Sequence, residues 1–186
     1  RLGRLHQYRL ADINPAQALI ELRRAVEHAR TAQKLIAQIG YPFYEALSHL
    51  QMAELLHQTG ENQKASEQLK IAGELVIQTG GLILEYMYWM AKAQFALDKG
   101  EEDSGLEFLR KAMELGREQG YVRTYTSWQP TAMARICAKA LAEGIEVEYV
   151  QNLIRKLELR PDPLPIEIDN WPWPLKIYTL GRFELA

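Results

Sequence analysis

The chain has 186 residues, of which 47% are hydrophobic and 25% charged, and its formal net charge is −2. This balance is typical of a soluble globular protein, and it gives no electrostatic reason to expect this segment to bind nucleic acid. No apolar run reaches the roughly 20 residues of a membrane-spanning helix, and a single cysteine excludes an internal disulfide. We therefore expect a cytoplasmic protein in a reducing compartment, with no membrane contact. Because the chain opens on Arg1 without Met, we also expect it to be a piece of a larger protein.

The first predicted elements are helices with clear start and stop signals. Residues 1–12 are predicted to be the second half of a helix, and Asn14-Pro15 has the cap and first-turn residues that begin another. That helix carries an apolar stripe and ends at Gly40, and Pro42 begins the next, which closes at Gly60. The acidic run Glu101-Glu102-Asp103 fits a helix start, where the dipole favours negative charge, better than a metal site.

Glycine is spaced regularly through the middle of the chain. Five of the twelve glycines lie at positions 40, 60, 80, 100 and 120, so two helices and their turns fill a 40-residue unit. When residues 61–80 are aligned with 101–120, seven positions are identical, including Leu69/Leu109 and Ala72/Ala112. A small-large pattern also recurs one unit apart, as Ala53, Leu56, Gly60, Ala65, Leu69, Ala72 and then Ala93, Ala96, Gly100, Gly105, Leu109, Ala112.

These features predict an all-α fold, a tetratricopeptide-like α-α superhelix of about 40-residue hairpins, followed by a short extended or β tail. Trp89 stands where the tetratricopeptide pattern places its tryptophan. The alternative is a set of unrelated amphipathic helices with glycines that coincide by chance.

The pattern changes after Gly120. Pro130 is predicted to begin a helix, with Ser127 as its candidate cap, and residues 146–159 form the last one. Five of the eight prolines then follow at 161, 163, 165, 172 and 174, which favours an extended, polyproline-like backbone. The alternating residues 175–180 predict a strand. We therefore divide the chain into a helical-repeat domain over 1–159, a proline-rich linker over 160–174, and the first strand of a truncated domain over 175–186.

Two stretches resemble a known family. The segments 120–125 (GYVRTY) and 130–134 (PTAMA), with Gly144-Ile145 and Tyr149-Val150, resemble the end of the helical-repeat domain in large bacterial ATP-dependent transcriptional activators of the MalT and LuxR type. The tail 171–185 (WPWPLKIYTLGRFEL) departs from the usual ending of that family. It resembles the start of an OmpR-type winged helix, as found in the SARP and bacterial transcriptional activator group.

This resemblance implies a sensor and relay in transcription regulation. In such activators the repeat domain binds a small-molecule effector or a protein on its concave face and passes the signal to ATPase and DNA-binding domains, so nucleic-acid contact would come from a downstream domain. Two alternatives stay open: a passive spacer that holds other domains apart, and a tetratricopeptide adaptor that binds peptides.

The tetratricopeptide geometry places the first helix of each hairpin on the concave face. The residues it predicts there are Leu47, Leu50, Glu54 and His57 in one unit and Met87, Met90, Gln94 and Asp98 in the next. Methionine-rich patches are adaptable binding surfaces, and the polar members could orient a ligand or peptide. Ordinary packing between helices is the alternative for the four apolar residues.

The sequence gives no sign of catalysis, of a cofactor or of a metal in this segment. The histidines at 6, 28, 49 and 57 lack metal-ligand spacing, and no phosphate loop, dinucleotide motif or nucleophile elbow is present. Cys137 lies on an apolar face, which predicts a buried, inert thiol.

The tail supports a further hypothesis. We expect Trp171 and Trp173 to pack over the last hairpin, and the strand that follows to pair with a second copy of the chain, which would give a homodimer. A monomer with a disordered end is the alternative.

Overall fold

The computed structural model describes residues 14–123, 130–175, 177–178 and 184–185. The helix predicted within residues 1–12 and the candidate cap Ser127 lie outside this part. The helices are α2 (Pro15–Ile39), α3 (Pro42–Gln58), α4 (Asn62–Thr79), α5 (Leu82–Asp98), α6 (Glu102–Gln119), α7 (Pro130–Ala142) and α8 (Val147–Leu157). Two short strands follow, β1 (Ile177–Tyr178) and β2 (Glu184–Leu185). The prediction of a helical body is therefore confirmed.

The helices begin and end at the predicted signals. Oδ1 of Asn14 accepts a hydrogen bond from the backbone N–H of Ala16 at 3.0 Å, and Pro42 and Pro130 begin α3 and α7. Gly80 and Gly120 end α4 and α6 in the left-handed conformation, with φ of 62° and 66°, which glycine adopts without the steric cost that a Cβ brings. The chain thus changes direction at 60, 80, 100 and 120, as the glycine spacing predicted.

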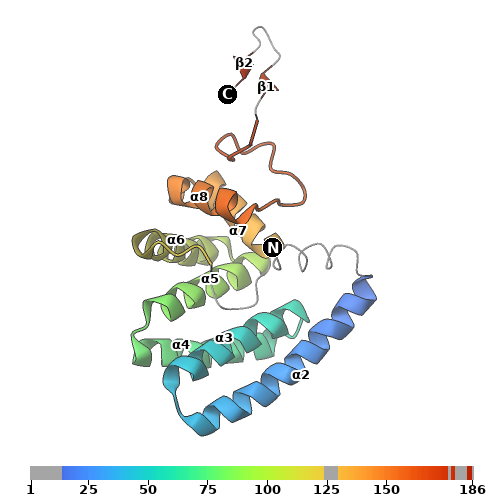
Figure 1. Ribbon diagram of the computed structural model, residues 1–186, viewed down its shortest axis with the longest axis vertical. Coiled ribbons are helices and arrows are strands. Elements are labelled where there is room, and N and C mark those ends of the chain that lie inside the picture. The colour runs from blue at the N-terminus through green and yellow to red at the C-terminus, as the bar shows by residue number, and fades with distance from the viewer. Residues whose placement is uncertain (1–13, 124–129, 176, 179–183, 186) are drawn as a thin grey trace.

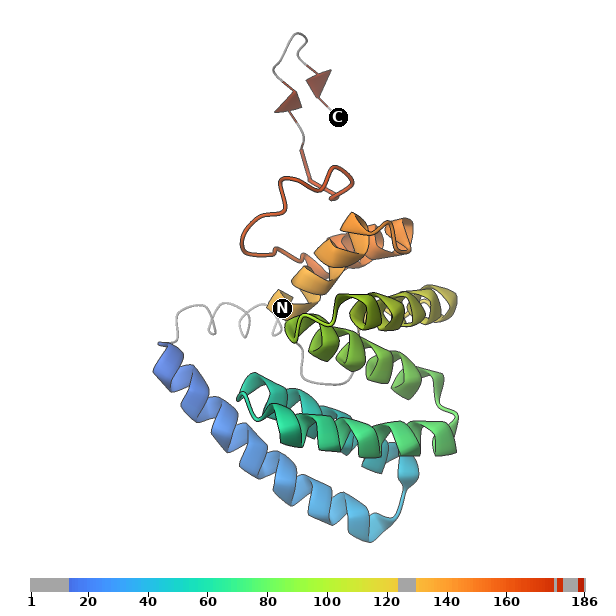
Figure 2. The same ribbon diagram turned by 180° about the vertical axis from the view of Figure 1, so that it is seen from behind.

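Helices next to each other in the sequence are also neighbours in space. Figure 1 shows α2 to α8 following one another from one end of the molecule to the other, and Figure 2 shows the same order from behind. The most extensive contacts join α3 to α4 and α5 to α6, and contacts of α5 with α3 and α4 join these two pairs. The predicted small residues lie at these contacts, since Ala53, Ala65, Ala72, Ala93 and Ala112 are fully buried.

The close approach of α6 to α5 depends on a missing side chain. A Cβ at Gly105 would lie 2.7 Å from Cδ2 of Leu97, well inside van der Waals contact. The absence of a Cβ therefore lets α6 pack directly on the end of α5. Ala65 has the equivalent place in the preceding pair and is also fully buried.

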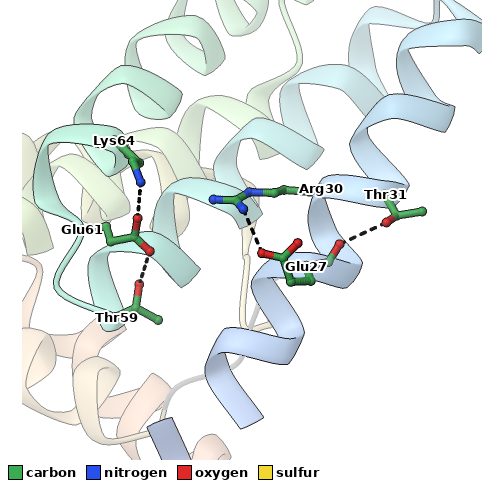
Figure 3. A network of polar contacts seen from close by, with 6 residues as sticks. All are labelled: Glu27, Arg30, Thr31, Thr59, Glu61 and Lys64. Carbon is green, nitrogen blue, oxygen red and sulfur yellow. Dashed lines mark hydrogen bonds and ion pairs between the residues drawn. The ribbon is translucent and has the colours of Figure 1, made fainter. Parts of the chain in front are cut away.

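Helix α2 is only partly covered. Val26 is 3% exposed and enters the core, whereas Leu35 and Ile39 are 57% and 72% exposed. The predicted apolar stripe is therefore partly exposed, because among the described helices α2 packs mainly on α3. Charged residues of α2 and of the start of α4 lie near one another, and each set forms an ion pair within its own segment (Figure 3). Arg30 of α2 pairs with Glu27 at 2.8 Å. The pKa of Glu61, at the start of α4, is lowered mainly by the hydrogen bond from Lys64 and to a smaller extent by the positive charge of Arg30.

The proline-rich segment is not extended, so that expectation was wrong. Residues 162–174 form bends and turns, with hydrogen bonds from the Ile168 N–H to the Pro165 carbonyl at 3.1 Å and from the Trp171 N–H to the Ile168 carbonyl at 3.0 Å. Trp171 is 5% exposed and belongs to the hydrophobic core, and Trp173 packs against that core. The predicted packing of the two tryptophans on the last hairpin is confirmed, and this burial is what holds the turns in place.

The expected strand pairs within its own chain. Strand β1 pairs with β2 in antiparallel orientation, Ile177 opposite Leu185 and Tyr178 opposite Glu184. The premise that it lacks a partner in the same chain was therefore wrong, and the argument for a homodimer loses its basis.

Candidate partner-binding face

The eight residues predicted to line a binding face lie on α3 and α5, and burial separates them into two groups. Leu50, Met87 and Met90 are 0%, 3% and 9% exposed and belong to the core. Leu47 is partly buried against the same core. A partner on the surface would scarcely touch these side chains, because they fill the space between neighbouring helices. For these residues, packing between helices is what the structure shows.

The polar group is closer to the surface. Glu54, His57 and Gln94 are partly buried, and Asp98 lies at the exposed end of α5. Of these four, His57 and Asp98 are in direct contact, although they are 41 residues apart in the sequence. The structure therefore brings together one residue from each of the two predicted units.

The imidazole of His57 is held on two sides. Its Nε2 lies 2.8 Å from Oδ2 of Asp98, and the ring stacks on Phe95 with centroids 4.0 Å apart and an interplanar angle of 18°. Nδ1 is buried and has no hydrogen-bond partner among the described residues. This arrangement favours the tautomer in which the Nε2–H donates to Asp98, because a lone pair at Nδ1 is less costly to leave unpaired than a buried N–H.

Asp98 extends this contact to a third helix. Its Oδ1 accepts from the guanidinium of Arg135 on α7, so α3, α5 and α7 are joined through one carboxylate. The side chains of His57, Asp98 and Arg135 are 11%, 27% and 53% exposed. The row therefore runs from an enclosed imidazole to an open guanidinium, and Arg135 is its most accessible member.

A second ion-pair cluster lies beside the first, one helical turn along α7. Nζ of Lys139 contacts carboxylate oxygens of Glu102 on α6 and of Glu143, the latter at 3.0 Å. The hydrogen bond to Glu102, followed by the one to Glu143, raises the pKa of Lys139 above its usual value. Lys139 therefore remains charged at neutral pH and joins α7 to α6.

Between these clusters lies a small hollow of about 250 Å³. It is lined by Gln94, Leu97, Asp98, Glu102, Arg135, Ile136 and Lys139. Its four charged groups comprise two carboxylates and two cations, so its net formal charge is zero. Ligand pockets usually enclose about 300–1,000 Å³. A hollow of this size and charge suits a small dipolar group, such as a side chain or backbone amide of a protein partner, better than a whole organic molecule.

Five of these residues were not predicted as site residues, namely Leu97, Glu102, Arg135, Ile136 and Lys139. Arg135 and Lys139 are four residues apart on α7, and Gln94 and Asp98 have the same spacing on α5. This i, i+4 spacing places both members of each pair on one helix face and could have indicated the site. The repeat alignment did not extend beyond residue 120, so α7 was not included.

Other chemistry has little support within the described residues. No group of three or more histidine, cysteine, aspartate or glutamate side chains there could hold a metal ion. Cys137 is fully buried, and burial raises the pKa of its thiol to about 12, so its reactive thiolate is scarce near neutral pH. Nor does any helix in this part of the chain combine the length and hydropathy needed to span a membrane.

Comparison with protein-family models, with curated proteins and with solved structures gives no significant match for this chain.

Proposed function

We propose that this chain is the regulatory helical-repeat module of a bacterial transcriptional activator, and that it binds a protein partner or effector beside Asp98, Arg135 and Lys139. The resemblance of residues 120–150 and 171–185 to such activators suggests the class. The observation that carries the binding role is the row from His57 through Asp98 to Arg135, because it ends in an exposed guanidinium beside a hollow of about 250 Å³.

The proposal includes a finer description of the fold. The pairs α3/α4 and α5/α6 are two tetratricopeptide-like hairpins of a superhelix, in which small rotations between units accumulate along the stack. Helices α3 and α5 would then line the concave side with α7 after them. In this description the segment from β1 onward leads into a winged-helix domain, through which the whole protein would contact DNA.

Binding at this face could change how the helices are joined. A partner carboxylate that bonds to Arg135 would compete with Asp98, and a partner cation would compete with Arg135 for Asp98. Either exchange weakens the link between α5 and α7. It shifts the shape of the stack only to the extent that the partner binds one arrangement more tightly than the other.

One observation favours the spacer alternative. The charges beside the hollow already pair with one another, Asp98 with Arg135 and Glu102 with Lys139. In a spacer, the sole role of these pairs would be to hold α7 on α5 and α6. Exposed pairs of this kind usually contribute about 0–1 kcal/mol to stability. The two proposals therefore differ in whether these residues affect binding, not in whether they affect folding.

A thermal-shift screen with a matched variant separates them. The wild-type chain and the double variant Arg135→Gln/Lys139→Gln are screened against cell metabolites and short peptides, with Arg110→Gln, an exposed site on α6, as control. A ligand of the native state at 100 times its Kd stabilises it by about 2.7 kcal/mol, and this raises Tm. We expect such a shift for the wild type and the control and its loss in the double variant. Equal shifts in all three would place the binding site elsewhere on the chain, and the absence of any shift would favour the spacer.

The coding sequence around this segment tests the class independently. We expect a nucleotide-binding loop upstream and a complete winged helix downstream. An uninterrupted reading frame with neither would contradict the assignment to transcriptional activators, whatever the screen shows.

A further inference from the structure

A larger cavity lies near the C-terminal end of α8, between the last turn of that helix, the residues that follow it and the folded proline-rich segment. Its volume is about 830 Å³, more than three times that of the hollow beside Asp98 and within the range of small-molecule sites. No sequence pattern predicted this cavity, because the prolines of residues 160–174 favour an extended linker. It does not overlap the proposed partner-binding face.

The walls of this cavity are mainly apolar and aromatic. Trp171, Trp173 and Leu164 line it together with three prolines and two aliphatic residues. The two indole rings lie 6.1 Å apart between centroids and are tilted by 53°. Flat indole and proline surfaces make favourable contacts with another flat ring. Leu164 is 58% exposed, so apolar surface is open to water at this place.

The walls are fixed on the helices below. The carbonyl of Asn170 accepts from Nε2 of Gln151 on α8 at 2.7 Å, and the Asn170 amide donates to the Leu141 carbonyl of α7 at 3.3 Å. At the end of α8, the Leu159 N–H donates to the Ile154 carbonyl at 3.0 Å, and Glu158 takes the left-handed conformation with φ of 51°. A cavity held in this way exists before a ligand arrives, so binding need not order it.

The charged groups of the lining are Arg155, Arg160 and Glu158, which gives a net formal charge of +1. Both arginines are exposed, so their guanidinium groups are open to a ligand. A guanidinium presents N–H donors in a fixed plane that matches a carboxylate. The lining therefore combines a flat apolar wall with cationic donors.

We infer that this cavity binds a small aromatic carboxylate, its ring against Trp173 and the prolines beside it and its carboxylate on Arg155 or Arg160. This inference does not depend on the proposed function, because the cavity shares no residue with the hollow beside Asp98. If both proposals hold, the chain has two separate binding sites. The site at α5–α7 takes a polar group of a partner, and the site at α8 takes an aromatic ring that carries a carboxylate.

The probe for the test is 1-naphthoate, measured by isothermal titration calorimetry on the full chain, with the neutral 1-naphthalenemethanol as the matched ligand. We expect naphthoate to bind with one-to-one stoichiometry. Arg155→Gln/Arg160→Gln should weaken its binding by about 10- to 100-fold, since charge-assisted hydrogen bonds contribute about 1.5–3 kcal/mol. The neutral ligand should bind more weakly than naphthoate and be unaffected by that change.

Two further variants locate the site. Trp173→Ala, a partly buried residue at the edge of the core, should weaken binding of naphthoate and of the neutral ligand by about 10-fold. Arg135→Gln/Lys139→Gln should leave both unchanged, which keeps this test distinct from that of the proposed function. The arginine changes are at exposed positions, so they remain informative if Trp173→Ala does not fold. Equal binding of the two ligands, equal affinity of the arginine variant, or no binding of naphthoate would each overturn the inference.

Discussion

The helices α3–α6 and the C-terminal part, from α7 to residue 175, differ in the residue that ends their last helix. In the first part α4 and α6 end at Gly80 and Gly120, which are left-handed. In the second part α8 ends at Glu158, with φ of 51°, although glutamate pays a steric penalty there. Left-handed glycines also end α2, at Gly40, and follow α7, at Gly144, with φ of 67° and 65°, so the end of α8 is where the chain departs from the glycine pattern.

The two parts also differ in what fills the space between helices. In α3–α6, alanine and glycine let backbones approach, as at Ala72 and Gly105. In the C-terminal part, α7 also buries small residues, at Ala134 and Ala140, but the segment after α8 is held by the buried ring of Trp171 and by hydrogen bonds of Asn170 with both α7 and α8. The difference explains why one part is recognisable from a repeat and the other is not.

The largest expected effects test whether the two parts unfold together. Leu109 in α6 and Leu153 in α8 are both fully buried in one continuous core. Leu109→Ala and Leu153→Ala should each lower the free energy of unfolding by about 2–5 kcal/mol. Urea unfolding followed by circular dichroism should give a single transition for both variants. Two separate transitions for Leu153→Ala would show that the C-terminal part is an independent unit.

A smaller effect is expected at a close contact that joins the two parts. A Cβ at Gly116 of α6 would lie 2.8 Å from Cε2 of Tyr86 and also against the hydroxyl of Tyr149, and both rings are almost fully buried. Tyr149 also donates from its hydroxyl to the Tyr121 carbonyl at 2.6 Å. Gly116→Ala should destabilise the fold by about 1–3 kcal/mol, even though alanine is the better helix former.

Gly73→Ala is the matched control for that change. Its Cβ would meet the ring of Tyr88 at 2.8–2.9 Å, but Tyr88 is only partly buried and can move away. We expect little net change, because the gain in helix propensity of about 1 kcal/mol offsets the displacement of the ring. Equal destabilisation by the two substitutions, measured by urea unfolding, would mean that ring burial does not decide the cost.

The smallest effects concern the helix ends themselves. Gly80→Ala should destabilise by about 1 kcal/mol, since a Cβ is unfavourable in the left-handed conformation although the space around it is open. Glu158→Gly should have the opposite sign and stabilise by roughly 0.5–1 kcal/mol. Thermal unfolding of the two variants against wild type measures both. A loss of stability in Glu158→Gly would show that the side chain of Glu158 stabilises the fold by more than its left-handed backbone conformation destabilises it.

Much of the candidate site was beyond the reach of local sequence patterns. His57 and Asp98 were both predicted for the same face, because each lies on the first helix of its own repeat unit. Their contact, and that of Asp98 with Arg135, depends on how α3, α5 and α7 are placed relative to one another. The apolar residues Leu50, Met87 and Met90 were placed on the same face, but their burial depends on neighbouring helices that a single-helix pattern does not include.

The sequence by itself determined where most of the described helices begin and end, because glycine, proline and asparagine act on the backbone within a few residues of their own position. It also determined which small residues would let helices approach. Only the tertiary structure decided that the proline-rich segment folds back into turns, since this requires Trp171 to be buried in the core and Asn170 to bond to α7 and α8. The same long-range packing creates the hollow beside Asp98 and the cavity beside Trp173, because each is formed by residues from segments that meet only in the folded chain.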